Sequence, residues 1–227
     1  MTTLGINAYL ALLEKYPHLT NNSDGELEII TDRELLYREQ ERLYRTADEK
    51  GRPRTWYDLG IVAQDQWTLV LRDLVRFPNG TCGGYLRKIN RNSQLELSGK
   101  DVSVLVTIDG KVLLMKHFRH DDRAWHWECP RGFGEAGLSP EENALKEISE
   151  ETGLTVLELT RINPENEQMA FFCAKCSGSC TNTDGTEVIT EFVLADLDEV
   201  AEMIVRGKID DPYTIRSLVL ASLHSCL

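Results

Sequence analysis

The stretch RGFGEAGLSPEENALKEISEETGL, residues 131–154, is the most informative part of the chain. Ser139 is placed as a helix N-cap, with Pro140 at the first helical position and Glu142 three residues after the cap. Gly153 is placed to end the same helix, because glycine readily adopts the left-handed conformation found at helix C-termini. The stretch therefore predicts a glycine-rich loop followed by a sharply bounded helix.

Three glutamates are expected to cluster on this helix. Glu147, Glu150 and Glu151 stand at positions i, i+3 and i+4, so their side chains project from one side. Like charges at this spacing repel each other. Such a face is either solvated or binds a hard cation, since Mg²⁺ and Mn²⁺ prefer carboxylate oxygens. The apolar face of the helix is expected to be formed by Ala144, Leu145 and Ile148.

The glycine loop in front of the helix favours the cation site. The stretch resembles the Nudix hydrolase family, whose box reads Gly, five residues, Glu, seven residues, then Arg-Glu-aliphatic-x-Glu-Glu-x-Gly-aliphatic. Seven of nine fixed positions match over 23 residues, from Gly132 to Leu154. Leu138 stands where the box has its first Glu, and Lys146 stands where it has Arg. Glu135 is expected to compensate, either as a partner for Lys146 or as an additional ligand.

The resemblance implies a fold and a metal-dependent chemistry. The implied fold is α+β, a Nudix-type α/β/α sandwich with a mixed β-sheet, plus an N-terminal helical and β extension. Mg²⁺ or Mn²⁺ is expected to be held by Glu147, Glu150, Glu151 and a backbone carbonyl near Arg131. Glu150 and Glu151 are therefore also counted as catalytic. The implied reaction is attack of water on a phosphorus of a diphosphate linkage.

The resemblance extends over roughly residues 56–220 and narrows the substrate. KVLLMKHFRH, followed by WHWECPRGFGE, resembles a stretch of the ADP-ribose pyrophosphatase branch in which a basic residue contacts phosphate. Arg119 is the first candidate for that residue and Arg123 the second, with a surface role as the alternative for Arg123. VRGKIDDPYTIRSLVLA resembles the segment before the last helix of that branch, which Asp211 or Thr214 is expected to cap.

The resemblance also implies a catalytic base outside the box, on a loop before a late strand. The counterpart here is TNTDGTEVITEF, in which Glu187 is the best match and Asp184 and Glu191 are alternatives. Asp184 followed by Gly185 is equally typical of a simple turn, which would leave Glu187 as a charge at a strand edge.

Members of the branch are usually homodimers in which the N-terminal strands pair with or cover the partner. We therefore expect a homodimer, formed through residues 56–95. Four aromatic residues could stack on a purine, although each is expected to pack in the core, which is the commoner role of an aromatic side chain. Trp56 is the first candidate for stacking. The group consists of Trp56, Tyr57, Trp67 and Phe77.

Three segments are expected: a helical extension over residues 1–55, a β segment over 56–95 and a Nudix domain over 96–227. The polar loop 89–100 is the best boundary. NAYLALLEKY and DRELLYREQERLYRTADEK have helical periodicity. DLGIVAQDQWTLVLRDLVRF predicts strands, followed by a turn at Pro78-Asn79-Gly80 and a short strand near Tyr85.

The last segment begins with a predicted hairpin, VSVLVTI and KVLLMKHF joined by Asp109-Gly110. Strands are then predicted in WHWEC, LTVLELTRI, MAFFCAKC and EVITEFVLA, and closing helices over 197–206 and about 212–225. His117, His120 and His126 are expected to lie near the pocket without serving as the main ligands. FFCAKCSGSC is interpreted as a strand with alternate thiols buried, because a structural zinc site needs four ligands.

Composition limits the possible partners. The 227 residues are 41% hydrophobic, as in an ordinary globular protein, and carry a formal charge of −12, which disfavours nucleic-acid polymers and anionic membranes. A membrane span and a signal peptide are not apparent, so a cytoplasmic location and six reduced cysteines are expected. Residues 135–165 hold eight Glu against two basic residues, so the acidity is expected to mark a cation site.

The expected function is hydrolysis of a nucleoside diphosphate linked to another group, with ADP-ribose giving AMP and ribose 5-phosphate as the first candidate. One alternative is another nucleotide sugar or a dinucleotide as substrate. The other alternative is a Nudix-fold nucleotide sensor with little or no catalysis, which the change at Leu138 favours and the retained glutamates disfavour.

Overall fold

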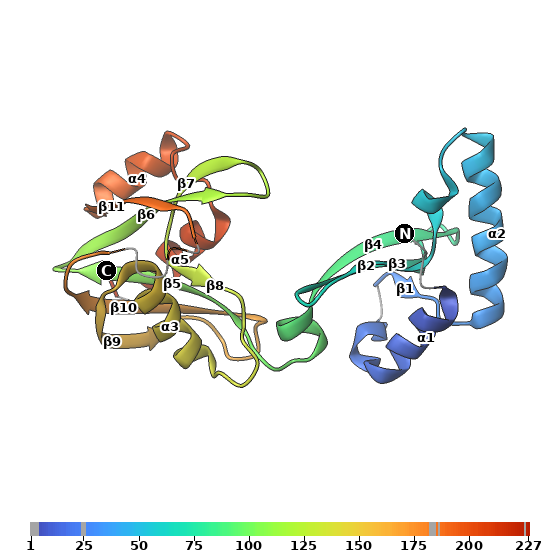
Figure 1. Cartoon of the computed structure of the whole chain (residues 1–227), viewed down its shortest axis with the longest axis horizontal. Coiled ribbons are helices and arrows are strands. Elements are labelled where there is room, and N and C mark those ends of the chain that lie inside the picture. The colour runs from blue at the N-terminus through green and yellow to red at the C-terminus, as the bar shows by residue number, and fades with distance from the viewer. Residues whose placement is uncertain (1–4, 24–25, 182–184, 186, 225) are drawn as a thin grey trace. The chain divides into compact units, whose positions relative to one another are not determined.

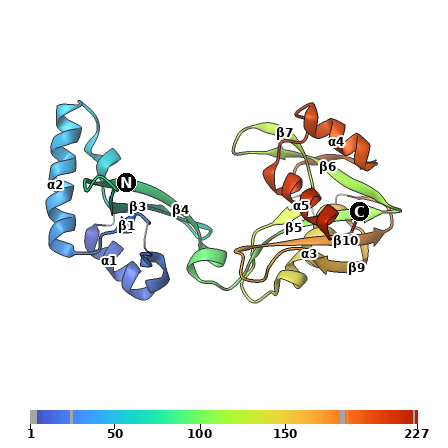
Figure 2. The same ribbon diagram turned by 180° about the vertical axis from the view of Figure 1, so that it is seen from behind.

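The protein is described by a computed structural model covering residues 5–23, 26–181, 185, 187–224 and 226–227. The chain divides into two compact units, Met1–Leu95 and Glu96–Leu227, whose elements are labelled in Figure 1 and shown from behind in Figure 2. No helix within the described residues combines the length and apolar character needed to cross a membrane.

The first unit combines helices with a small antiparallel sheet. The central strand β3 pairs with β4 over its full length, with β2 through residues 69–72 and with β1 through residues 75–76. In chain order, the elements are α1 (Ile6–Lys15), η1 (Pro17–Thr20), β1 (Glu28–Ile29), α2 (Arg33–Glu49), η2 (Arg54–Tyr57), β2 (Gly60–Gln64), β3 (Thr68–Arg76), β4 (Cys82–Asn90) and η3 (Arg91–Leu95).

Both predicted helices of this unit are confirmed, and they pack on the sheet. Tyr9 of α1 and Leu36 of α2 are fully buried in one cluster with Leu69 and Leu71 of β3. The strand predicted near Tyr85 is longer than expected. Nine residues of β4 pair with β3, because a long partner strand extends a segment that looks short by its own composition.

The second unit contains a seven-stranded sheet in the order β11-β6-β5-β10-β9, with β7 paired to β6 and β8 to β5. The β5–β10 pair is parallel and the other pairs are antiparallel, so the sheet is mixed as expected. The elements are β5 (Asp101–Ile108), β6 (Lys111–Arg119), β7 (Ala124–Glu128), β8 (Arg131–Gly132), α3 (Pro140–Thr152), β9 (Thr155–Arg161), β10 (Met169–Ser177), β11 (Ile189–Ala195), α4 (Leu197–Val205) and α5 (Pro212–Leu223).

Helices cover both faces of this sheet. Alternate residues of a strand point to opposite faces, so the neighbours Phe171 and Phe172 of β10 enter different clusters. Phe172 packs with Ile148 of α3, whereas Phe171 packs with Val200 of α4 and Leu218 of α5. This arrangement is the expected α/β/α sandwich.

Most local predictions for this unit are confirmed. Asp109 and Gly110 both have positive φ, 49° and 78°, as a tight two-residue hairpin requires. Cys173 and Cys176 of β10 are buried, as expected for thiols on a core strand. The expectation for Leu145 is wrong: its exposed fraction is 43%, because it lies one residue, about 100° of helix rotation, past buried Ala144.

Candidate functional site

Helix α3 begins and ends at the residues that the sequence predicts. The Ser139 side chain accepts a hydrogen bond from the Glu142 backbone N–H, and the Glu142 carboxylate accepts one from the Ser139 N–H. Gly153 adopts the left-handed conformation at the C-cap, with a φ of 70°. These two ends fix the rotation of the helix and therefore the direction in which its glutamates project.

Glu151 points into the unit and is only 4% exposed. One carboxylate oxygen, Oε2, accepts a hydrogen bond from the backbone N–H of Arg131 at 3.1 Å. The other oxygen, Oε1, is buried and has no hydrogen-bond partner among the described residues. Burial, and then the charges of Glu187 and Glu147, raise the pKa of Glu151 well above its usual value of 4.5.

Glu147 lies against the backbone of Gly132, where a Cβ atom would overlap its carboxylate. This close approach explains why glycine is needed at the start of the loop. Burial raises the pKa of Glu147 to about 7, an effect that the Lys146 charge opposes and the Glu150 charge reinforces. Glu147 and Glu151 thus form a carboxylate pair in an environment that disfavours their charged forms.

Lys146 connects the loop to the helix. Its Nζ donates hydrogen bonds to Glu135 Oε1 and Glu150 Oε2, both at 2.8 Å. The expectation that Glu135 becomes a partner of Lys146 is therefore confirmed. Glu150 faces this ammonium group and is less enclosed than Glu151, so the three glutamates of the helix are not equivalent.

His117 of β6 and Glu187, which lies two residues before the start of β11, join Glu151. Among the described residues, these three bring ligand atoms within 4.8 Å of one another, as a shared metal ion would require. His117 Nε2 lies 2.8 Å from Glu187 Oε2, and its Nδ1 is buried with no hydrogen-bond partner in the described part of the chain. His117 is only 3% exposed.

The sequence did not single out His117 among the three nearby histidines. Its role depends on the β6–β11 pairing, in which Ile189 faces His117 and so brings the preceding Glu187 close to the imidazole. A period-two count along KVLLMKHFR would have shown only that His117 lies on the same face as buried Met115 and Leu113. The register between β6 and β11, which brings Glu187 to His117, cannot be deduced from the sequence of either strand alone.

Two arginines are held beside this group by a buried carboxylate. Glu128, 1% exposed, accepts hydrogen bonds from Arg119 Nε at 3.0 Å and lies 3.1 Å from Arg131 Nε. Arg131 also lies 3.2 Å from Asp211, which caps α5 as expected by accepting the Thr214 backbone N–H. The remaining Arg119 nitrogen, Nη1, lies 3.9 Å from Glu187 Oε2.

Several other sequence candidates lie apart from this group. Arg123 pairs with His120 Nδ1 at 2.8 Å in the β6–β7 turn. Glu191, an alternative base, is paired with Lys116 at 2.7 Å, and Asp184 lies outside the described residues. His126 is held by Asp122 and Asp210, each at 2.8 Å.

The aromatic candidates belong to the first unit. The expectation that Trp56 and Trp67 pack in a core is wrong, because they are 62% and 52% exposed. Trp56 lies on the short helix η2 and Trp67 in the β2–β3 turn, where neither side chain is covered. Tyr57 packs partly against the core, and the Phe77 ring lies over Gly83.

The buried carboxylates suit a divalent cation chemically. The described residues supply no hydrogen-bond donor to Glu151 Oε1, so ionisation of this carboxylate is costly unless a cation compensates its charge. Two carboxylates and an imidazole around one point form a donor set found in metal centres. The residues present therefore fit a metal ion.

Comparisons with known proteins identify the family and the fold. A family model described as the NUDIX domain matches residues 98–216. An ADP-ribose pyrophosphatase of Bacillus subtilis (strain 168) is 35% identical over 88 residues, 39% of this chain and 44% of the relative. A putative ADP-ribose pyrophosphatase, YjhB, of the same organism is 34% identical over 93 residues, 37% of this chain and 42% of the relative.

The chain thus spans less than half the length of the curated relatives it matches. A solved structure titled as an ADP compounds hydrolase shares the fold, with a TM-score of 0.58 and 18% identity over 71% of this chain and 88% of that one. Because the NUDIX domain match covers more than half of the residues, the chain belongs to the Nudix family.

Proposed function

We propose that this protein hydrolyses the diphosphate linkage of a nucleoside diphosphate joined to another group, with ADP-ribose as the first candidate. The products would be AMP and ribose 5-phosphate. The observation that carries the proposal is the convergence of Glu151, Glu187 and His117 around one point, with Glu147 beside them. The names of the curated relatives support ADP-ribose as the substrate to test first.

Mg²⁺ or Mn²⁺ is the proposed cofactor. The groups proposed to hold it are Glu147, Glu150, Glu151, His117 and the backbone carbonyl of Arg131, with Glu187 beside them as the base. A bound divalent cation would offset the negative charge of the diphosphate and polarise its phosphorus–oxygen bonds. The imidazole of His117 favours Mn²⁺ over Mg²⁺, because Mg²⁺ prefers oxygen ligands and nitrogen ligands bind transition metals more tightly.

The chain's own groups have separate tasks in this proposal. Glu187 accepts a proton from the attacking water at its carboxylate, since it is more exposed than Glu151 and reaches the cluster from a loop. As the new phosphorus–oxygen bond forms, the bond to the bridging oxygen breaks, and that oxygen leaves with the electron pair. Glu128 orients Arg119 by accepting hydrogen bonds from its Nε and Nη2. The Nη1 group of Arg119 is proposed to donate a hydrogen bond to a phosphate oxygen of the substrate.

Other elements of the proposal concern substrate recognition and assembly. Arg123 is a second proposed phosphate contact. Trp56, which is 62% exposed, is proposed to stack on the purine of a substrate bound by the other copy of a homodimer. A homodimer formed through residues 56–95 is also proposed. Sedimentation equilibrium would test the dimer, which a single monomeric mass at micromolar concentration would exclude.

The activity is tested by incubating the protein with ADP-ribose and following the phosphate monoesters by ³¹P NMR. Reactions with Mg²⁺, with Mn²⁺ and with EDTA separate cation-dependent turnover from background. We expect AMP and ribose 5-phosphate to form only with a divalent cation. A panel of nucleotide sugars and dinucleotides identifies the preferred group beyond the diphosphate.

Glu187→Gln is the informative variant, with Glu141→Gln as its matched control. Glu141 is an exposed glutamate in the first turn of the same α3 helix that carries the candidate ligands. Removing the base should lower the rate about 10²–10⁴-fold, and the control should leave it unchanged. Binding of ADP-ribose without turnover of any panel member would instead favour a nucleotide sensor. Leu138, which stands where the Nudix box has its first Glu, is the residue that favours this alternative.

A further inference from the structure

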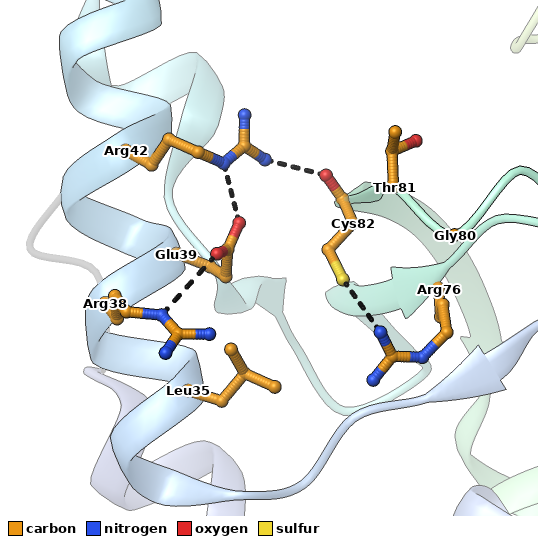
Figure 3. Close-up of a pocket in the computed structure, with 8 residues that line it drawn as sticks. All are labelled: Leu35, Arg38, Glu39, Arg42, Arg76, Gly80, Thr81 and Cys82. Carbon is orange, nitrogen blue, oxygen red and sulfur yellow. Dashed lines mark hydrogen bonds and ion pairs between the residues drawn. The ribbon is translucent and has the colours of Figure 1, made fainter.

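The first unit contains a pocket of about 510 Å³ between helix α2 and the β3–β4 turn. Figure 3 shows its two walls, with Arg38, Glu39 and Arg42 on the helix and Arg76 and Cys82 on the strands. A volume of this size is typical of sites for small organic ligands. The pocket lies entirely within Met1–Leu95 and shares no residue with the candidate site above.

The helical wall follows from the periodicity of α2. Leu35, Arg38, Glu39 and Arg42 stand at i, i+3, i+4 and i+7 and therefore share one face. Another face of the same helix is buried in the core through Leu36, Gln40, Leu43 and Ala47. The core packing of α2 thus fixes which arginines face the turn.

Arg42 is oriented by two hydrogen bonds. Its Nε donates to Glu39 Oε2 at 2.6 Å and its Nη2 donates to the Cys82 carbonyl at 2.7 Å, so it spans the two walls (Figure 3). These bonds leave the Nη1 donors without a partner among the described residues. A guanidinium group that is already oriented loses less entropy when it binds an anion.

Arg76 supplies a second oriented guanidinium from the opposite wall. Its Nε donates to Glu28 Oε2 at 2.7 Å, and its Nη1 lies 3.8 Å from Cys82 Sγ. Arg38 is less constrained: its side chain is 74% exposed, and its one ion pair among the described residues is with Glu39, at 3.9 Å. Arg42 and Arg76 are therefore the two arginines of the pocket whose orientation is held by hydrogen bonds.

The pocket has an excess of positive charge. Its lining carries three arginines and one glutamate, and even with Glu28 outside it the arginines outnumber the carboxylates. Residues 1–95 hold thirteen basic and thirteen acidic residues, so the first unit has no net charge. The grouping of three arginines in the pocket is therefore not the result of a general excess of basic residues. Guanidinium groups from two sides match the several terminal oxygens of a phosphate better than the two coplanar oxygens of a carboxylate.

We propose that this pocket binds the phosphate group of a small phosphate monoester, held by Arg42 and Arg76 from opposite walls and by Arg38 at the rim. The lining includes no aromatic side chain, so recognition is directed at the phosphate and not at a base. Inorganic phosphate, ribose 5-phosphate and AMP should therefore bind with similar affinity.

Calorimetric titration of ribose 5-phosphate into the full chain tests the proposal. EDTA is present throughout, so that divalent cations do not attract phosphate to the carboxylates of the second unit. We expect saturable one-to-one binding that weakens as salt is added, and no binding of ribose. No saturable heat with any of the three phosphates would overturn the proposal.

Variants locate the binding. Arg42→Gln and Arg76→Gln should each raise the Kd at least about tenfold, since each removes a charged hydrogen bond. Arg45→Gln is the matched control, because Arg45 is an exposed arginine of α2 outside the pocket lining. An unchanged Kd in Arg42→Gln, or an equal rise in Arg45→Gln, would contradict the assignment.

Fold integrity is checked by circular dichroism. Arg38→Gln provides a second test if either of the other variants unfolds, because Arg38 is exposed and its contact with charged groups of the described chain is limited to the long ion pair with Glu39. It should raise the Kd several-fold without altering the melting temperature. An Arg38→Gln protein that binds ribose 5-phosphate as tightly as the wild type would remove the rim contact from the proposal.

Discussion

Individual residues of the candidate site are arranged at a cost to stability. Charged carboxylates are rarely buried without partners, yet Glu151 is 4% exposed, and the part of the chain that the structure describes offers one of its oxygens no hydrogen-bond donor. Its pKa is raised mainly by burial and further by Glu187 and Glu147. The site therefore stores electrostatic repulsion that a bound cation would relieve.

Replacing Glu151 by Gln should stabilise the cation-free protein. The pKa of Glu151 in the folded protein lies above 4.5, its usual value in an unfolded chain. The contribution of Glu151 to the free energy of unfolding is therefore fully present below pH 4.5 and is lost as the pH rises toward the pKa of the folded protein. In EDTA at pH 8, the melting temperature should rise by about 2–4 °C for each kcal/mol of repulsion removed. The gain should shrink toward pH 4.5. A variant less stable than wild type at pH 8 would show that the carboxylate is compensated within the protein.

His117 should bind metal directly. Electron spin echo envelope modulation of the Mn²⁺-loaded protein detects coupling to an imidazole nitrogen, and this signal should vanish in His117→Gln. The same change should weaken Mn²⁺ binding more than Mg²⁺ binding, because only the transition metal gains much from a nitrogen ligand.

His120→Gln is the matched control for that experiment. His120 lies in the exposed turn that follows β6, where its Nδ1 pairs with Arg123. Its loss should leave the nitrogen coupling intact. Coupling that persists in His117→Gln and disappears in His120→Gln would reverse the assignment.

At the scale of single elements, the glycine loop positions the helix. Gly132 makes room for the Glu147 carboxylate, and Gly134 lies against the backbone of Gly99 and Lys100. A methyl group added at Gly132 would meet the Glu147 side chain, which can move aside. A methyl group added at Gly134 would meet backbone, which cannot, so the two substitutions should have different consequences.

Gly132→Ala should leave the protein folded but displace Glu147, lowering turnover by about 10²-fold, as a shift near 1 Å in a catalytic group can do. Gly134→Ala should lower the melting temperature strongly. Gly5→Ala, with open space around the added methyl group, should leave turnover unchanged and lower the melting temperature only slightly, because alanine is a poorer N-cap than glycine for α1. Thermal unfolding measured beside turnover separates the two effects, and equal melting temperatures for the two loop variants would disprove the distinction.

Local signals in the sequence predict elements well and their partners poorly. The ends of α3 and the Asp109–Gly110 hairpin were predictable because capping and turn chemistry act within a few residues. The two-residue strand β8 was not predicted, because its only basis is pairing with β5, far away in the sequence. His117 was missed for the same reason.

At the scale of the whole molecule, charge is distributed unevenly between the units. Residues 1–95 are neutral, and residues 96–227 hold twelve basic against twenty-four acidic residues, so the entire excess of −12 lies in the unit with the carboxylate cluster. The expectation that acidity marks the cation site stays a prediction. A unit of this charge should bind a diphosphate weakly without divalent cations.

The measurement that tests the central proposal most directly is the steady-state rate of ADP-ribose hydrolysis by wild type and Glu151→Gln, with Glu141→Gln as control, at saturating Mg²⁺ or Mn²⁺. We predict that the Glu151 variant is folded and slower on the order of 10³-fold, because it loses a proposed ligand at the centre of the cluster. The control should match the wild type. A Glu151→Gln protein that retains the wild-type rate would contradict the assignment of the cluster as a catalytic metal site.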